Sequence, residues 1–382
     1  MKISKMKYFD QSRHWNLNMM TFKKLTLLVG ASGVGKTQIL KSILNLRNIT
    51  KGASVNGLRW EIEFNISNDM YIWQGEFEKI SQENETVLID FITIDNDEEK
   101  KDAPKIICEK LYKNGSEVIN RDEDKIMFNN VKTVKLPQEK SVVNLLKEED
   151  EVSIIYKNFQ KITLHDHSET GALRFSSGDI EVKVEKYKNV EDIQESDESV
   201  RTKLYLTSLK SEKIFSVIKD KFIDVFPYVE NFKIEPISSK KIPFFLKQTP
   251  FIQIKEKGVE HWIDERQISS GMLRTLLHVS ELYLGANGTI ILVDEFENSL
   301  GVNCIDELTN ELLIHKRNLQ FIITSHHPYI INNINYSNWK IVTRKAGSVT
   351  ARDATAFNLS KSKHEAFTQL INLDEYSEGV EV

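Results

Sequence analysis

Short runs in which apolar and polar residues alternate fill the first part of the chain, and turn-forming residues separate them. Alternation with a period of two predicts half-buried strands, and a succession of such strands predicts an antiparallel sheet. We expect strands at residues 3–9, 15–22, 58–64, 70–73 and 87–92, and a further strand in the apolar run at residues 25–29. The N-terminal part is therefore predicted to contain an antiparallel β lobe.

The middle of the chain carries a mixed pattern. Residues 136–159 are predicted to form one helix, and a second helix is expected over residues 200–222. An acidic stretch at residues 184–200 resembles a linker, and short strands are expected at residues 244–246 and 251–254. This pattern indicates an inserted segment that contains both helices and strands.

The last third of the chain changes character. Apolar residues recur at helical spacing from Ser270 to Leu284, and continuous apolar runs follow at residues 289–293 and 321–324. A continuous apolar run is typical of a strand that is buried on both faces. A further helix is expected between these strands, over residues 303–315. Strand–helix alternation predicts a parallel core, so the expected fold class is α/β.

A complete G-x-x-x-x-G-K-[ST] motif follows the predicted strand at residues 25–29 and precedes a helical run. In this setting the motif binds phosphates, because glycines let the backbone wrap a phosphate and the helix N-terminus presents free N–H groups. Lys36 is expected to act in catalysis by neutralising β- and γ-phosphate oxygens, and the Thr37 hydroxyl is expected to ligate Mg²⁺. We therefore expect a nucleoside triphosphate to bind to Gly30, Ala31, Ser32, Gly33, Val34, Gly35, Lys36 and Thr37.

Asp294 and Glu295 directly follow the apolar run at residues 289–293. A carboxylate at the carboxyl end of a strand beside a phosphate loop can hold Mg²⁺ through water, which is the role expected of Asp294. Glu295 is expected to act as the catalytic base that polarises the attacking water. Glu297, two residues further on, is a rival base that the sequence leaves open.

Two further groups complete the predicted site. Ser269, Ser270 and Gly271 open the predicted helix that ends at Leu284, and their small side chains leave its N-terminus free for an anion. His326 follows the buried run at residues 321–324, where an imidazole can donate to a γ-phosphate oxygen and position water. Both groups are expected to act on the terminal phosphate.

The composition and charge of the chain argue against some classes of function. The chain has 382 residues and a net charge of −5, which argues against a polycation that coats nucleic acid. Residues 201–255 nevertheless carry eleven Lys or Arg against five Asp or Glu, so a basic face for nucleic acid stays open. Cys108 and Cys304 are too few for a disulfide framework, and no apolar run approaches membrane-spanning length. We expect a cytoplasmic protein without a membrane partner.

Together these motifs resemble those of ABC-type ATPases. The resemblance places the signature motif at residues 269–272, where Ser-Ser-Gly-Met departs from the usual Ser-Gly-Gly-Gln. It assigns the D-loop to residues 298–301 and the switch histidine to His326. The residues that follow the acidic pair, and the Thr-Ser-His-His-Pro sequence at residues 324–328, resemble the sequences of the RecF/SMC/OLD-like branch rather than those of transporter subunits.

Within that branch the chain resembles compact AAA-type ATP-binding proteins of bacterial and phage-defence operons. Their closing pattern, Phe-Asn-Leu-Ser followed by Tyr-x-x-Gly, reappears at residues 357–360 and 376–379. No long heptad array of the kind found in coiled-coil SMC proteins separates the two halves. The segment after His327 is too short for the TOPRIM nuclease domain of OLD nucleases, so nuclease activity is expected from another polypeptide.

The resemblance implies a P-loop NTPase core of ABC type, formed by residues 1–58 and 256–382, with a β lobe and the inserted segment at residues 59–255. It implies ATP and Mg²⁺, and an oligomer of at least two copies that face head to tail, so that Ser269 and Gly271 of one copy close on ATP bound to the other. ATP hydrolysis would then switch a separately encoded nuclease or toxin in anti-phage defence. The alternative is a RecF-like DNA-repair clamp that binds DNA directly.

Two residue roles stay open. The glutamine that couples Mg²⁺ to the second lobe of such ATPases is expected to be Gln74 or Gln138. The ring that stacks on adenine is expected to be Trp15 or Phe9, each of which is equally well explained as a core aromatic.

Overall fold

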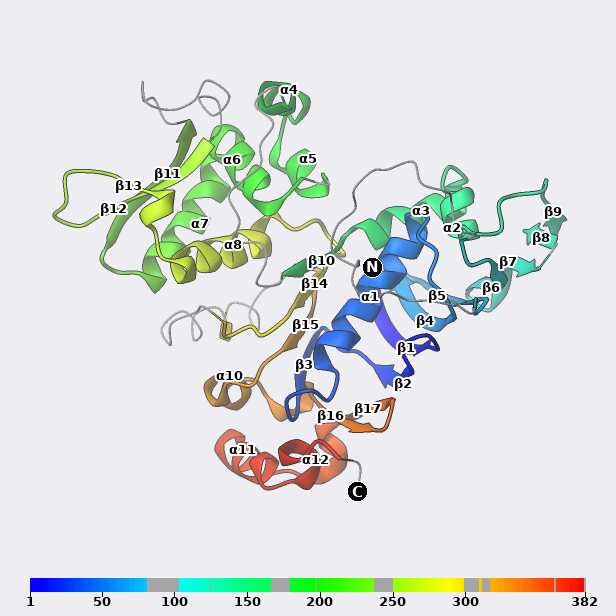
Figure 1. The fold of residues 1–382 in the computed structure, drawn as a ribbon. Coiled ribbons are helices and arrows are strands. Elements are labelled where there is room, and N and C mark those ends of the chain that lie inside the picture. The colour runs from blue at the N-terminus through cyan, green and yellow to red at the C-terminus, as the bar shows by residue number, and fades with distance from the viewer. Residues whose placement is uncertain are drawn as a thin grey trace.

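The computed structural model describes residues 1–80, 103–123, 125–165, 179–196, 198–236, 250–298, 309–310, 317–360 and 362–380. Within these residues, fourteen strands form one continuous sheet and three strands form a second, smaller one. The large sheet has an antiparallel part and a parallel part, and helices cover the parallel part (Figure 1).

The antiparallel lobe forms one end of the large sheet, and its longer strands alternate between buried and more exposed residues. The predicted antiparallel lobe is therefore confirmed, whereas the predicted strand at residues 87–92 lies outside the described residues. The strands are β1 (Lys2–Asp10), β2 (Trp15–Thr21), β4 (Leu58–Ile66), β5 (Asp69–Phe77), β6 (Ile106–Lys113), β7 (Ser116–Asp122), β8 (Lys125–Phe128) and β9 (Val131–Lys132).

The parallel part of the sheet confirms the predicted α/β core. In spatial order it consists of β10 (Ile162–His165), β14 (Ile290–Val293), β15 (Gln320–Thr324), β3 (Leu25–Val29) and β16 (Trp339–Lys345). Every residue of β3, β14 and β15 is buried, as the continuous apolar runs predict. β17 (Ser348–Asp353) pairs with β16 on one side and with β2 on the other, and so joins the two parts into one sheet.

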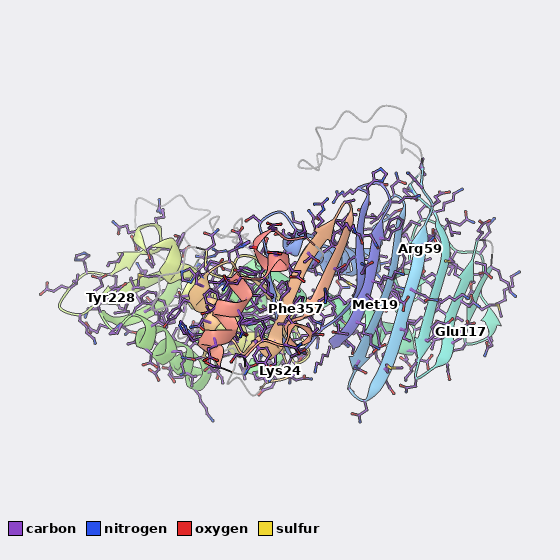
Figure 2. All side chains as sticks on the ribbon, turned by 90° about the horizontal axis from the view of Figure 1, so that it is seen from below. Met19, Lys24, Arg59, Glu117, Tyr228 and Phe357 are labelled. Carbon is purple, nitrogen blue, oxygen red and sulfur yellow. The ribbon has the colours of Figure 1, made fainter. Side chains whose placement is uncertain are left out.

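A second group of elements lies at the other side of the parallel strands, and we call it the helical lobe (Figure 1). Figure 2 shows Tyr228 in this lobe and Arg59 and Glu117 on the antiparallel strands at the opposite end of the molecule. The helical lobe consists of α4 (Asp179–Lys186), α5 (Val190–Glu195), α6 (Val200–Lys210), α7 (Glu212–Val225), β11 (Val229–Pro236), β12 (Pro250–Glu256), β13 (Ile263–Asp264) and α8 (Ser270–Leu284).

The parallel strands separate two hydrophobic cores. Leu28 of β3 packs in one core with α1 (Lys36–Thr50), α2 (Val142–Leu145), α3 (Asp150–Gln160) and the antiparallel lobe. Leu27, its neighbour in the same strand, packs in the other core with α6, α7 and α8. Successive side chains of a strand point to opposite faces, so β3 is fixed from both sides immediately before the glycine-rich loop.

Two of the predicted helices are wrong as single elements. The helix predicted over residues 136–159 is divided into α2 and α3, because Leu146 leaves helical geometry and a new helix begins at Asp150. Acidic residues in the first turn of α3 favour a helix N-terminus there. The helix predicted over residues 200–222 is divided into α6 and α7 by Ser211, whose φ of −148° and ψ of 85° are not helical.

Four other expectations in the middle and C-terminal parts have different outcomes. The acidic stretch at residues 184–200 is not a linker, since it holds the end of α4 and all of α5. The strand predicted at residues 251–254 is confirmed within β12. The strand predicted at residues 244–246 lies outside the described residues, as does nearly all of the helix predicted at residues 303–315.

The C-terminal elements lie beside β16 and β17. They are α10 (Pro328–Asn333), α11 (Lys363–Ile371) and α12 (Asp374–Ser377), and α12 packs against β16 (Figure 1). Among all described helices, none is long and apolar enough to span a lipid bilayer.

Candidate nucleotide-binding site

The glycine-rich loop joins the end of β3 to the start of α1. Gly30 has a φ of +144°, and a Cβ atom there would lie 2.5 Å from the carbonyl oxygen of Val342 in β16. Gly35 has a φ of +108° and forms the N-cap of α1 in the left-handed region. Only glycine meets both requirements without strain, so these two positions allow the loop to pass over β16 and enter the helix.

Lys36 folds back into the loop. Its Nζ donates to the carbonyl oxygens of Gly30 at 2.8 Å and Ala31 at 2.7 Å. Burial lowers the pKa of Lys36 to about 8, although the carboxylates of Asp294, Glu297 and Glu295 act in the opposite direction. The amino group therefore occupies the inside of the loop, close to the three acidic side chains.

Thr37 and Asp294 are joined directly. The Thr37 Oγ1 donates to the two carboxylate oxygens of Asp294, at 3.1 and 2.9 Å. Thr324, at the end of β15, also donates to Asp294 through its Oγ1 at 2.7 Å. Because β14, β15 and β3 are parallel neighbours, their carboxyl ends bring these side chains to one edge of the sheet.

These groups fit a magnesium ion. A hydroxyl and a carboxylate are hard oxygen ligands, and Mg²⁺ usually takes one or two protein ligands of this type together with substrate phosphates and water. No cluster of three or more His, Cys, Asp or Glu side chains suited to a metal occurs in the described parts of the chain. One hydroxyl and one carboxylate are a donor set that fits a metal shared with a nucleotide.

Glu295 and Glu297 lie on the turn that follows β14. Glu295 has a φ of +47°, its N–H donates to Thr324 Oγ1 at 2.7 Å, and its carboxylate accepts from Asn298 Nδ2 at 3.1 Å. Glu297 Oε1 accepts the backbone N–H of His326 at 2.6 Å, and its buried Oε2 has no hydrogen-bond partner. Both carboxylates thus remain candidates for the base, as the sequence left them.

His326 follows β15 by two residues and is exposed. Desolvation and the positive charge of Lys36 lower the pKa of its imidazole, against the effect of the nearby carboxylates. The neutral form is therefore favoured near pH 7. A neutral imidazole can donate one hydrogen bond and accept another, as the predicted contact with a phosphate requires.

The structure places the predicted signature residues elsewhere. Ser269 caps α8, and its Oγ accepts the N–H of Met272 at 3.2 Å; Ser269 and Ser270 are exposed. Figure 1 shows α8 in the helical lobe, on the other side of β14 and β15 from α1. Arg274, one turn into α8, donates to the carbonyl of Asn298. Of the predicted D-loop, Ser299, Leu300 and Gly301 lie outside the described residues.

A cavity of about 180 Å³ lies beside the glycine-rich loop. Trp15 lies in its wall, and the buried Nε1 of this side chain has no hydrogen-bond partner. No motif in the sequence pointed to Arg13 or Arg344, which also line the cavity. The full lining is Tyr8, Asp10, Arg13, Trp15, Gln38, Ser42, Asn45 and Arg344.

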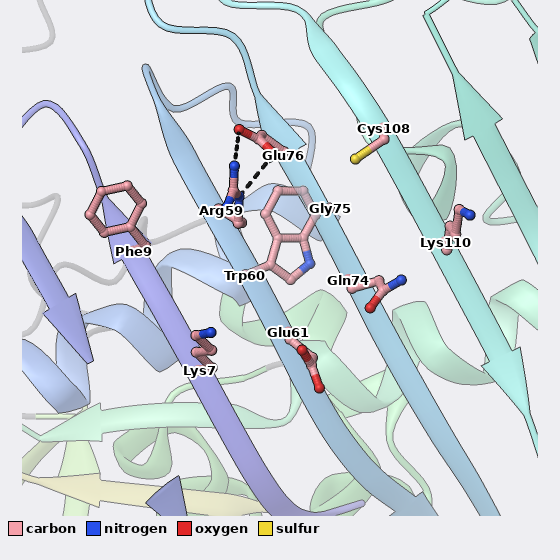
Figure 3. A pocket seen from close by; sticks show the side chains of 10 residues that line it. All are labelled: Lys7, Phe9, Arg59, Trp60, Glu61, Gln74, Gly75, Glu76, Cys108 and Lys110. Carbon is pink, nitrogen blue, oxygen red and sulfur yellow. Dashed lines mark hydrogen bonds and ion pairs between the residues drawn. The ribbon is translucent and has the colours of Figure 1, made fainter. Parts of the chain in front are cut away.

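Phe9 and Gln74, which the sequence left open, lie together in a different place. Both line a groove of about 170 Å³ on the outer face of the antiparallel lobe, with Lys7, Cys108 and the Arg59–Glu76 ion pair (Figure 3). Tyr8 and Phe9 are adjacent in β1 and point to opposite faces, which explains why only Tyr8 reaches the cavity beside the loop.

Gln138, the other candidate glutamine, donates through its Nε2 to the carbonyl of Glu123 at 2.8 Å. β10 is the edge strand beside β14 in the large sheet, and its last residue, His165, pairs with Val293. The local sequence pattern did not predict β10, because this strand has only four residues and β14, the strand it pairs with, follows more than a hundred residues later.

Comparison with known proteins agrees with this geometry. Residues 25–332 match a family described as "AAA domain, putative AbiEii toxin, Type IV TA system". The chain belongs to this family. No curated protein matches the sequence. The resemblance to ABC-type ATPases of the RecF/SMC/OLD-like branch is thereby confirmed at the level of the family.

Solved structures extend the comparison from this AAA family to its fold. An SMC head bound to the C-terminal winged-helix domain of ScpA has 13% sequence identity and a TM-score of 0.51, over 92% of this chain and 97% of the other. An SMC head with an extended coiled coil, from Pyrococcus furiosus, has 12% identity and a TM-score of 0.50, over 92% and 95%. The fold is therefore that of an SMC-head ABC ATPase domain, and the family is one of nucleotide-binding ATPases.

Proposed function

We propose that this protein binds and hydrolyses ATP with Mg²⁺ at a head-to-tail interface between copies of the chain, and that the nucleotide state switches a separately encoded effector. The observation that carries the proposal is the contact between Thr37 and Asp294. It unites the phosphate loop with the acidic end of β14, as a site for a metal-bound triphosphate requires.

The residue roles follow from the positions of the side chains. Residues 30–36 hold the phosphates through backbone N–H groups, and Lys36 exchanges its two carbonyl partners for phosphate oxygens. Thr37 and Asp294 hold Mg²⁺, which when bound neutralises charge on the phosphate oxygens. Glu295 takes the proton of the attacking water, and His326 donates to the terminal phosphate.

Trp15 provides the aromatic wall of the adenine site. It lies in the cavity beside the loop, whereas Phe9 lies in the groove on the outer face. Arg344, at the same cavity, donates to the carbonyl of Gly33 in the loop, and Arg13 also lines the cavity, so both add positive charge for the nucleotide.

The exposed N-terminus of α8 supports a composite site. Ser269, Ser270 and Gly271 have free surface in the helical lobe and lie apart from the loop of their own chain. In a head-to-tail dimer they would meet the terminal phosphate that the other copy holds, and loss of that phosphate would release the contact. ATP hydrolysis would then control the association of the two copies.

The family description supports a role beside a toxin. A chain that carries ATPase motifs and is grouped with toxin–antitoxin systems is well placed to control a toxin or nuclease, in anti-phage defence. The second candidate is a DNA clamp, which the excess of basic residues at 201–255 favours. In the described part of that range, Lys233 and Lys255 are paired with Glu235 and Glu230, which reduces the free positive charge.

The experiment measures ATP turnover per chain over a range of protein concentrations. Wild type should become more active as the concentration rises, and Glu295→Gln should be about a hundredfold slower or worse because it lacks the base. Lys36→Ala should lose nucleotide binding. Turnover that does not change with concentration, in a protein that stays monomeric with ATP, contradicts the interface. DNA retention that requires ATP and weakens with salt would favour the clamp over the effector switch.

A further inference from the structure

The segment from Tyr376 to Gly379 lies against the glycine-rich loop. Gly379 is buried and has a φ of +72°, and a Cβ atom there would lie 2.3 Å from Val34 Cγ1 and 3.1 Å from Ala31 Cβ. The backbone at Gly379 therefore touches two side chains of the loop, and there is no room for a side chain between them.

Arg344, at the end of β16, connects the same segment to the loop. Its backbone N–H donates to the carbonyl of Gly379 at 2.8 Å. Its Nη1 donates to the carbonyl of Gly33 at 3.4 Å, and its Nε donates to Ala346. One residue thus holds both the C-terminal segment and the turn of the loop.

The other end of the segment is Tyr376. Tyr376 belongs to α12 and is half-buried, and burial followed by the charge of Glu297 raises the pKa of its phenol. Glu297 in turn accepts the backbone N–H of His326. The segment therefore contacts the glycine-rich loop through Gly379, and its Tyr376 is close enough to Glu297 for that carboxylate to affect the phenol.

We propose that residues 376–379 form a brace that holds the glycine-rich loop in the conformation that binds the phosphates of ATP. This inference rests on the proposed function, since it assigns a positioning role at the same site. A glycine-rich loop has high conformational entropy when unsupported, and ordering it on binding would weaken affinity. The brace removes part of that cost before the nucleotide arrives.

The test compares two glycines with the same backbone geometry. Gly258 has a φ of +77°, close to that of Gly379, but a Cβ atom there would meet nothing within 4 Å. Gly379→Ala and Gly258→Ala therefore introduce the same left-handed strain, and only the first pushes against the loop. The measurement is the Kd for a fluorescent, non-hydrolysable ATP analogue, with the thermal midpoint of each nucleotide-free variant beside it.

Gly379→Ala should weaken binding about tenfold, which corresponds to about 1.4 kcal/mol, while Gly258→Ala binds as wild type does. Gly379→Ala should also have the lower thermal midpoint of the two, because only its methyl group meets the loop, so both Kd values are measured well below either midpoint. Adding Val34→Ala to Gly379→Ala removes the Cγ1 atom that lies 2.3 Å away and should restore binding. This rescue would show that the lost affinity comes from the contact with Val34 and not from the left-handed backbone strain at residue 379.

A second measurement needs no substitution. Amide hydrogen exchange of the wild-type protein should slow at residues 374–380 as well as at residues 30–37 when ATP is added, because the two segments are ordered together. Equal Kd values for Gly379→Ala and Gly258→Ala, or unchanged exchange at residues 374–380, would overturn the brace. In that case the proposed function would still stand if wild type binds the analogue and Lys36→Ala does not. Failure of wild type to bind the analogue would overturn both.

Discussion

The hydroxyl of Thr37 donates to both carboxylate oxygens of Asp294, although 257 positions separate the two residues in the chain. The order of strands explains the contact, because β15 lies between β3 and β14 and all three run in the same direction. A loop after β3 and a turn after β14 must then meet at one edge of the sheet.

Replacement of Asp294 tests this contact. Asp294→Asn keeps the shape of the side chain and one hydrogen-bond acceptor for Thr37, but removes the charge that holds Mg²⁺. We expect turnover at saturating ATP to fall by about a hundredfold or more, and higher Mg²⁺ concentrations to be needed. Steady-state rates over a Mg²⁺ titration check this, and a Mg²⁺ dependence equal to that of wild type would be inconsistent with the assignment.

The pKa of Lys36 predicts how ATP affinity depends on pH. Burial lowers this pKa to about 8 in the nucleotide-free protein, and the phosphates of bound ATP would raise it again. Below about pH 8 the amine is already charged and affinity should be constant. Above that pH the amine must take up a proton on binding, so affinity should fall by up to about tenfold per pH unit.

Calorimetry in buffers of different ionisation enthalpy measures that proton uptake directly. Lys36→Arg is the control, because a guanidinium stays charged throughout the range. An affinity that stays level from pH 7 to well above pH 8 in the folded wild-type protein would rule out a titrating Lys36.

Gly30 predicts a loss of stability. In Gly30→Ala the new methyl would lie 2.5 Å from the Val342 carbonyl oxygen, and the residue would keep a φ of +144°. We expect the free energy of unfolding to fall by about 1–3 kcal/mol or more. Gly33→Ala is the matched control, since Gly33 has a φ of +80° with nothing within 4 Å of a Cβ atom. Chemical denaturation of both variants should show the larger loss for Gly30→Ala, and equal losses would speak against the close approach to β16.

The two aromatic candidates for adenine binding predict different outcomes. Trp15→Ala removes a wall of the cavity beside the loop and should weaken ATP binding by about tenfold, since stacking on a base is worth about 1–3 kcal/mol. Phe9→Ala changes only the groove on the outer face and should leave the Kd unchanged (Figure 3). Titration of a fluorescent ATP analogue distinguishes them, and a loss confined to Phe9→Ala would reverse the assignment.

Local sequence patterns predicted the elements that carry their own signal. The apolar runs predicted the strands β3, β14 and β15, and the motifs that follow these strands identified Lys36, Asp294 and His326 as site residues. Alternation predicted the first antiparallel strands for the same reason, because burial on one face leaves a period of two in the sequence.

Patterns failed where a distant contact decides the structure. Apolar residues recur at helical spacing on both sides of the division between α2 and α3 and of the break at Ser211, so this pattern did not reveal where one helix ends and the next begins. Arg344 and Gly379 reach the glycine-rich loop from more than 300 positions away, and neither belongs to a motif that names a nucleotide contact. The parallel pairing of β10 with β14 also joins distant parts of the chain, so local patterns did not predict it.

The central claim is that two chains build each ATP site, and mixing two inactive variants tests it most directly. Lys36→Ala lacks a working phosphate loop, and Ser269→Arg blocks the exposed start of α8. A mixed dimer contains one site in which both parts are intact, so the mixture should regain ATP turnover that neither variant has alone. No recovery, in mixtures whose mixed oligomers are demonstrated by affinity tags, would contradict the account.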